Sequence, residues 1–99
     1  MRLSRKEIEA LKYALEDVEY DKYLFGSRVE NKKRGGDIDI LIDADISTEE
    51  RFRFCQKIAK QFFSKCEEKI DVVVINRNRL SKNEKAFLEV IQLEKIDSI

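Results

Sequence analysis

The chain has 99 residues, the usual length of one domain, so we predict a single domain spanning residues 1–99. Apolar residues make up 42% of it, enough for a packed core, but no apolar run approaches the roughly 18 residues needed to cross a bilayer. Twenty basic and twenty acidic residues cancel, which excludes a strong overall attraction to nucleic acid. The first ten residues lack the apolar stretch of a signal peptide, so we expect a cytoplasmic protein with no membrane segment.

The absence of histidine excludes several kinds of site. Neither a Ser-His-Asp nor a Cys-His nucleophile can be built, and a zinc site is not expected from two cysteines alone. Cys55 and Cys66 are eleven residues apart, a spacing that returns to nearly the same face of a helix. We therefore expect them to be reduced thiols in the core.

Three segments carry the signature of a helix start, a serine followed three residues later by a glutamate. The pairs are Ser4 with Glu7, Ser47 with Glu50, and Ser81 with Glu84. Apolar residues at helical spacing follow each pair, which predicts amphipathic helices over residues 4–19, 48–66 and 82–93. The stripes expected to be buried are Ile8, Leu11, Leu15 and Val18 in the first, Phe52, Cys55, Ile58, Ala59, Phe62 and Cys66 in the second, and Ala86, Phe87, Val90 and Ile91 in the third.

The segments between these helices are typical of strands. "DKYLFG" (21–26), "DIDILID" (37–43) and "KIDVVVI" (69–75) are short and rich in β-branched or aromatic residues, and the tail "EKIDSI" would add a small edge strand. The order predicts an α+β domain (α/β-type, two layers) with a mixed β-sheet and helices packed on one face. The helix over 48–66 favours a parallel, right-handed return from strand 37–43 to strand 69–75.

Acidic residues alternate along the strand over residues 37–43. Asp37 and Asp39 fall on one face while the isoleucines fall on the other, so two carboxylates stand about 7 Å apart, as alternate side chains of a strand do. Carboxylate oxygens suit Mg²⁺, and Asp71 would join them if its strand is the neighbour. Asp43 and Asp45 are better explained as strand-end and loop acids.

A glycine-serine pair and a basic loop precede these acids. Gly26 and Ser27 offer exposed backbone N–H groups to a phosphate, although a plain strand-ending turn is the better explanation of the pair on its own. Positive charge then surrounds the loop, from Arg28, Lys32, Lys33 and Arg34. Contact with phosphate and simple solvation are both open for the loop lysines, while Arg77 and Arg79 are better explained by a solvated turn. The order of glycine-serine, basic loop and acids is the one a nucleoside triphosphate requires.

A Gly-Ser pair, nine further residues, Asp-Ile-Asp at a strand start and a later aspartate opening another strand together resemble the polymerase-β-like nucleotidyltransferase superfamily. The resemblance covers about residues 10–93 and is strongest to the minimal nucleotidyltransferases of bacteria and archaea. The chain departs from their usual pattern in the "VEN" after Arg28 and in Gly36 before the first aspartate.

The resemblance implies a role for each motif residue. Gly26 and Ser27 would hold the triphosphate, and Arg28 matches the arginine that follows the serine in small members. Asp37 and Asp39 would share two Mg²⁺ ions, and Asp71 would be the third metal ligand, on the side of the attacking hydroxyl.

The implied activity is transfer of AMP from ATP to a hydroxyl group with release of pyrophosphate. Small stand-alone members resemble antitoxins that pair with a HEPN ribonuclease toxin and adenylylate it, so the expected partner is a HEPN-type toxin encoded by a neighbouring gene, in a complex with this chain. Two alternatives stay open: a non-catalytic subunit that neutralises its partner by occlusion, and a nucleotidyltransferase acting on a small molecule such as an aminoglycoside.

Overall fold

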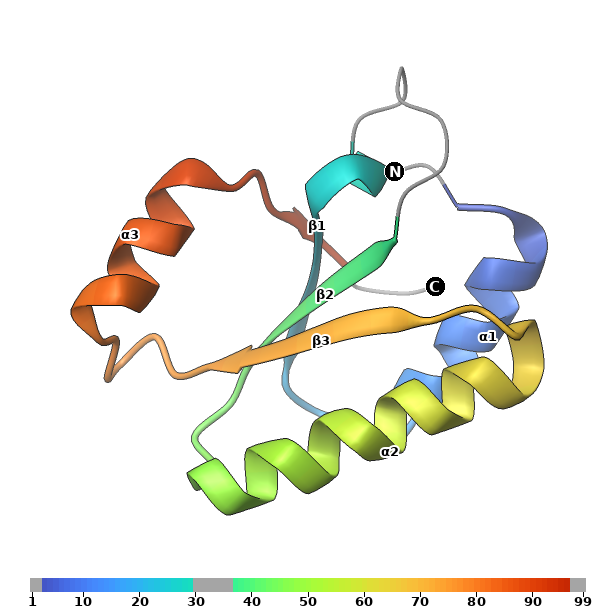
Figure 1. Cartoon of the computed structure of the whole chain (residues 1–99), viewed down its shortest axis with the longest axis horizontal. Coiled ribbons are helices and arrows are strands. Elements are labelled where there is room, and N and C mark those ends of the chain that lie inside the picture. The colour runs from blue at the N-terminus through green and yellow to red at the C-terminus, as the bar shows by residue number, and fades with distance from the viewer. Residues whose placement is uncertain (1–2, 30–36, 97–99) are drawn as a thin grey trace.

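A computed structural model describes residues 3–29 and 37–96 (Figure 1). The helices are α1 (Arg5–Leu15), α2 (Thr48–Cys66) and α3 (Lys82–Val90), with a short 3₁₀ turn, η1 (Gly26–Val29). The strands are β1 (Asp21–Phe25), β2 (Ile38–Asp43), β3 (Ile70–Ile75) and the two-residue β4 (Glu94–Lys95). They form one sheet in the order β3-β2-β1-β4.

The sheet is mixed, as the sequence predicts. β1 runs antiparallel to both β2 and β4, whereas β2 and β3 are parallel and joined through α2. The register places Asp39 opposite Phe25 of β1 and opposite Asp71 of β3. The predicted neighbour relation between the two aspartate-bearing strands is therefore confirmed.

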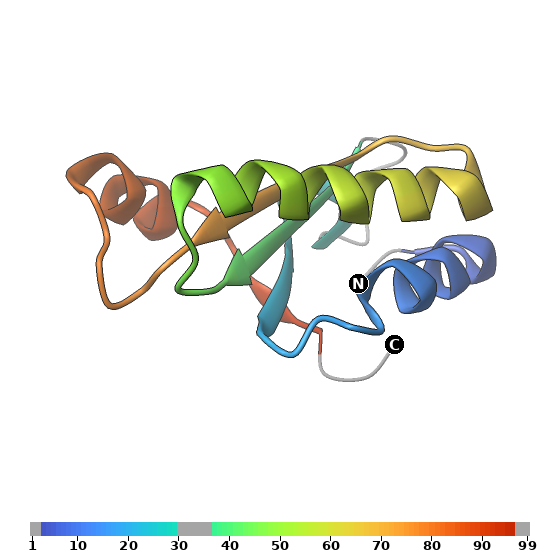
Figure 2. The ribbon, with the colours of Figure 1, turned by 90° about the horizontal axis from the view of Figure 1, so that it is seen from below.

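One face of the sheet is covered by α1 and α2, which pack against each other (Figure 2). The even-numbered residues of the strands point to this side. Their packing against the two helices removes the apolar surfaces of the sheet and of the helices from water. The largest fully buried side chains of this core are Leu11, Leu24, Ile38, Ile40, Ile42, Ile58 and Phe62.

The third helix covers part of the opposite face, so the expectation that helices pack on one face holds for α1 and α2 only. The rings of Phe87 in α3 and Phe25 in β1 meet edge to face, with centroids 5.5 Å apart. Phe25 shares the odd-numbered face of the sheet with Leu41 and Ile75, and these three are buried together. Figure 1 shows α3 set apart from the α1–α2 pair. Without α3, the apolar side chains of Phe25, Leu41 and Ile75 on this face would be exposed to water, and packing of α3 against them buries them.

All three predicted helix starts are confirmed. Ser4, Ser47 and Ser81 each accept a hydrogen bond from the backbone N–H three residues on, and the reciprocal glutamate bond closes a full capping box at Ser4 and Ser81. The first helix ends at Leu15 rather than at 19, because the Val18 N–H donates to the Leu15 carbonyl oxygen at 3.0 Å in a tighter turn.

Three residues placed in buried stripes are exposed, and one of them is Ala86 of α3. Phe52 is 65% exposed and Val90 is 82% exposed, so the predicted burial of all three is wrong. In α2 the buried line repeats every four residues through Ile58, Phe62 and Cys66, and Phe54, not Phe52, continues it toward the N-terminus. Val90 is the last residue of α3, and the predicted extension of that helix to residue 93 does not form.

Both cysteines are free thiols, Cys66 buried and Cys55 partly so, as expected. Burial raises the pKa of each. Within the described ranges, no helix combines the length and apolar character that crossing a membrane requires.

Candidate functional site

The centre of the candidate site is the pair of aspartates that the parallel register of β2 and β3 places side by side. Asp39 and Asp71 are direct partners on the adjacent strands β2 and β3. Burial raises the pKa of Asp39, and the negative charges of Asp71 and then Asp37 raise it further. The sheet therefore holds like charges together on one face.

The predicted set of three carboxylates is only partly assembled. Over residues 3–29 and 37–96, no three acidic or cysteine side chains converge closely enough to form a metal-binding group. Asp37 lies just before β2 and is exposed, near enough to act on Asp39 through its charge. The donors present still suit a hard divalent cation, because they are carboxylate oxygens whose mutual repulsion such an ion would relieve.

The turn after β1 approaches this acid pair closely. Gly26 has a φ of +79°, in the left-handed region that favours glycine. A Cβ atom at this position would overlap Oδ2 of Asp39. Glycine is therefore required twice, once for the backbone conformation and once for the approach of the turn to the carboxylate.

Arg28 is held by α1. Its Nη1 donates to Oε1 of Glu7 at 2.8 Å, and the same oxygen accepts from the Ser4 N–H at 2.8 Å. Glu7 is only 4% exposed. Burial by itself raises the pKa of Glu7, but the hydrogen bonds with Arg28, Ser4 and Glu68 outweigh it and bring the pKa to about 2. Sequence reasoning assigned Glu7 to a helix cap and missed this ion pair, since 21 residues separate the partners.

Arg28 also borders a pocket of about 310 Å³ near the acids. The pocket is lined by Arg28, Asp37, Ile38, Glu68 and Lys69. The pKa of Arg28 is raised first by its bond to Glu7, with a contribution from the charge of Asp37. The turn after β1, the start of β2 and the segment before β3 thus meet at one end of the sheet, where the predicted triphosphate would lie.

The structure describes some of the other residues singled out in the sequence, and others lie outside it. The backbone of Ser27 lies in η1 beside Gly26, whereas Lys32, Lys33 and Arg34 lie outside the described residues. Asp43 accepts a hydrogen bond from the Arg77 N–H at 3.0 Å. This contact agrees with the interpretation of Asp43 as a strand-end acid.

A family comparison supplies the class of this site. A model of the family described as polymerase beta, nucleotidyltransferase matches residues 8–98. The chain belongs to this family. A search of the curated proteins finds no match. Family membership supports nucleotidyl transfer as the activity of the protein, and the matched region includes the glycine turn, both strands of the acid pair and all three helix bodies except the first turn of α1.

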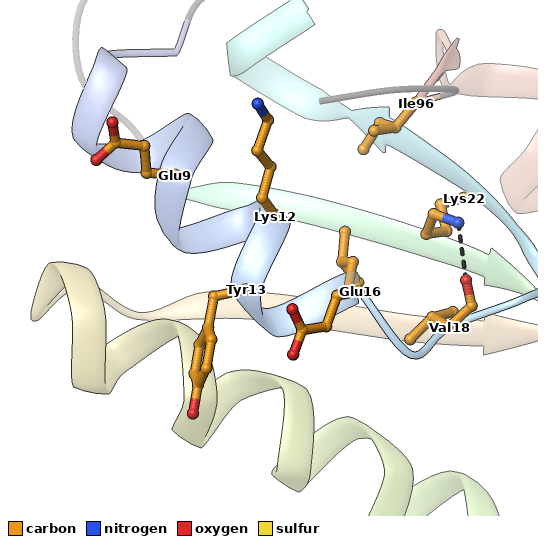
Figure 3. Close-up of a pocket in the computed structure, with 8 residues that line it drawn as sticks. Glu9, Lys12, Tyr13, Glu16, Val18, Lys22 and Ile96 are labelled. Carbon is orange, nitrogen blue, oxygen red and sulfur yellow. Dashed lines mark hydrogen bonds between the residues drawn. The ribbon is translucent and has the colours of Figure 1, made fainter.

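A further pocket of this nucleotidyltransferase, of about 570 Å³, lies along α1 (Figure 3). Its lining includes Glu9, Lys12 and Tyr13 of α1, and Lys22 of β1, whose Nζ donates to the Val18 carbonyl at 3.0 Å. Lys22 lies opposite Ile42, so it belongs to the helix-covered face of the sheet. The pocket shares no residue with the acid site.

We predict that Gly26→Ala impairs this nucleotidyltransferase in two ways. The left-handed backbone costs roughly 1–2 kcal/mol for a residue with a Cβ atom, and that atom displaces the Asp39 carboxylate. Thermal unfolding and transfer assays measure the two effects. Gly26→Asn is the matched variant, since asparagine tolerates the left-handed region but still carries the Cβ atom. It should unfold at a higher temperature than Gly26→Ala and be just as inactive; wild-type transfer by either variant would contradict the required close approach.

Proposed function

We propose that this nucleotidyltransferase transfers AMP from ATP to a hydroxyl group of a partner protein. The observation that carries the proposal is the in-register pairing of Asp39 with Asp71, directly beside the left-handed turn at Gly26, in a domain of the nucleotidyltransferase family. Carboxylates next to bare backbone N–H groups are what metal-assisted phosphoryl chemistry requires.

Each element of the site has a role in this reaction. The turn at Gly26 and Ser27 presents backbone N–H groups to the triphosphate, and Arg28 adds positive charge at its side. The acceptor oxygen forms a bond to the α-phosphorus while the bond from that phosphorus to the oxygen bridging to the β-phosphate breaks. Pyrophosphate leaves with the electron pair, and the hydroxyl proton passes to the Asp71 carboxylate and then to water.

Asp37, Asp39 and Asp71 are the residues that would hold Mg²⁺, with two ions in the arrangement that the family resemblance implies. When bound, the metal neutralises charge on the phosphates and lowers the pKa of the acceptor hydroxyl. The raised pKa of Asp39 supports this assignment, because burial and two neighbouring acids leave its charge in need of a cation.

For the acceptor we propose a HEPN-type ribonuclease toxin encoded by a neighbouring gene. Its support is the resemblance of the motif to the antitoxin-type minimal nucleotidyltransferases, together with an apolar pocket bordered by Asp71 that suits a polypeptide better than a sugar. The complex of the two proteins would be cytoplasmic, with the toxin inactivated by AMP attached to one of its hydroxyl side chains.

Transfer from ATP labelled in the α-phosphate tests this function. With the neighbouring gene product as acceptor, the wild-type protein should add label to the acceptor and raise its mass by whole AMP units. Label that appears equally with the Asp37→Asn and Asp39→Asn variants would overturn the assignment. Full neutralisation of the partner by these variants, without added mass, would favour the alternative of a non-catalytic subunit that acts by occlusion.

A further inference from the structure

We propose that the acceptor protein binds as an extended segment added to the edge of β3, with one apolar side chain in the pocket beneath it. This inference rests on the proposed function and specifies how the acceptor is recognised. In the part of the chain that the structure describes, β3 pairs with β2 on one side and with no strand on the other. Figure 1 shows β3 at this border of the sheet.

The backbone direction of β3 shows which groups face the open edge. The Ile75 carbonyl accepts from the Ala44 N–H at 2.8 Å, so Ile75 faces β2. The Val74 carbonyl instead accepts from Arg51 Nη1 at 3.3 Å, so it faces outward. Because the backbone groups of successive strand residues point to opposite sides, those of Ile70 and Val72 also face outward. These groups form a template for another strand.

The sequence of β3 leaves this edge available. Its residues, "IDVVVI", contain neither lysine nor proline, the residues with which proteins commonly block an exposed strand edge. Val72 and Val73 are only partly buried. Arg51 covers the far end at Val74, so the accessible stretch is the near end, Ile70 to Val72, which includes the predicted metal ligand Asp71.

A pocket of about 410 Å³ lies between α2 and this near end of β3. Its apolar lining comes from Ala59, Phe63 and Ile70, and Lys60 and Lys69 add positive charge, with Asp71 at the border. The Phe63 side chain is 50% exposed although it lies beside apolar neighbours. The pocket therefore suits an apolar side chain from a segment that carries negative charge nearby.

The alternation of a strand connects this pocket to the acids. Ile70 points to the helix-covered face and Asp71 to the face of Asp39, so β3 itself lies between the pocket and the acid pair. Successive side chains of an added strand also point to opposite faces. A segment with one side chain in the pocket thus presents the next residue beside Asp71, where its hydroxyl oxygen can attack the α-phosphorus as described above.

The occupant is therefore defined by its chemistry. It is an extended loop or tail of the acceptor protein, in which the modified hydroxyl residue stands directly next to an apolar residue and acidic residues lie nearby to meet Lys60 and Lys69. A second copy of this chain pairing edge to edge would occupy the same strand without delivering a hydroxyl group, and the test must separate the two.

Two synthetic peptides serve as the probe, each of nine residues with a central tyrosine. One has leucine on both sides of the tyrosine and glutamates beyond, and the other has lysine at all of those positions. With labelled ATP, the wild-type protein should modify the first peptide at least about tenfold faster. Adding the first peptide should also slow hydrogen exchange at the amides of Ile70 and Val72.

Two variants separate this inference from the proposed function. Phe63→Ala removes one wall of the pocket, and Val72→Pro removes an outward N–H without touching the ladder to β2. Phe52→Ala is the matched control, since Phe52 is an exposed phenylalanine of the same helix that does not line the pocket. Phe63→Ala and Val72→Pro should lower modification of the peptide about tenfold, with Mg²⁺-dependent binding of a non-hydrolysable ATP analogue unchanged; Phe52→Ala should change neither.

Equal modification of the two peptides, or modification of neither, overturns the inference. It is also overturned if the amides of β3 are already protected from hydrogen exchange without peptide and sedimentation shows that the protein self-associates. In each case the proposed function stands if the wild-type protein still labels its partner protein. If no protein acceptor is labelled while the peptide still protects Ile70 and Val72, the proposed function fails and the docking surface remains.

Discussion

The Asp39→Asn protein is expected to lose nucleotidyl transfer by at least about 10²-fold while unfolding at a higher temperature than the wild type in the absence of divalent cations. Asp39 has two acidic neighbours: Asp71, its partner on the next strand, and Asp37, two residues earlier in the chain. Burial and these two charges raise its pKa, which means that its ionised form is less favourable in the folded protein than in the unfolded chain. Asparagine removes that charge and keeps the shape.

The sign of the pH dependence follows. A carboxyl group with a raised pKa in the folded state destabilises the fold once the pH passes its ordinary value, so the stability advantage of Asp39→Asn should be absent in acid and present at neutral pH. Thermal unfolding with chelator across this range measures it, beside a transfer assay at neutral pH.

Asp43→Asn is the matched control for Asp39→Asn. Asp43 is on the same strand and the same face, but its Oδ1 accepts a hydrogen bond from Arg77, a role that asparagine retains. This variant should transfer AMP at close to the wild-type rate. Loss of activity in both variants to the same extent would show that the assay responds to the charge of β2 in general, which would contradict a specific role for Asp39.

Glu7→Gln is expected to lower the free energy of unfolding at neutral pH on the order of 3 kcal/mol, a large share of the 5–15 kcal/mol typical of a domain. Glu7 accepts from Arg28 and Ser4 and is almost fully buried. Its pKa falls from 4.5 to about 2 because Arg28, Ser4 and Glu68 outweigh the effect of burial, while Glu7 raises the pKa of Glu68 and so offsets part of this stabilisation. Neutral glutamine removes the charge that raises the pKa of Arg28 most, and leaves the smaller effects of Glu68 and Asp37.

Acid should abolish the difference between wild type and Glu7→Gln. Because the folded pKa is the lower one, the stabilisation by Glu7 is present above pH 4.5 and is lost as the pH falls toward about 2. Denaturant unfolding at several pH values measures this loss. Glu9→Gln is the matched control, since the Glu9 side chain is 69% exposed and 3.9 Å from Arg5. A difference between wild type and Glu7→Gln that stays constant down to pH 2 would contradict the ion pair.

Local signals in the sequence predicted most of the fold. Ser4, Ser47 and Ser81 mark helix starts because a cap depends only on residues within one turn. The buried line of α2 was less predictable. Phe52 and Phe54 are both apolar, but Phe54 packs against the core and meets the ring of Tyr20, with centroids 6.0 Å apart, whereas Phe52 is exposed. The position of α3 depends on the apolar residues around Phe25 and Leu41, on strands distant in sequence from the helix.

In the candidate site, too, local sequence patterns predict some features, whereas others depend on contacts between residues distant in sequence. Alternation along β2 predicts that Asp37 and Asp39 share a face. The helix α2 between β2 and β3 predicts that the two strands are parallel neighbours, so the pairing of Asp39 with Asp71 could be anticipated. The close approach of Gly26 to Asp39 could not, because it depends on the register between β1 and β2. The bond between Glu7 and Arg28 joins residues on separate elements, and no local pattern indicates it.

Divalent-cation binding tests the central claim most directly. Titration of Mn²⁺ into the protein with a non-hydrolysable ATP analogue, followed by electron paramagnetic resonance, counts the bound ions without requiring turnover. We predict saturable binding to the wild type and to Asp43→Asn, weakened by at least about tenfold in Asp39→Asn and Asp71→Asn. Binding of Mn²⁺ to these two variants with wild-type affinity would show that the paired carboxylates of β2 and β3 do not hold the metal.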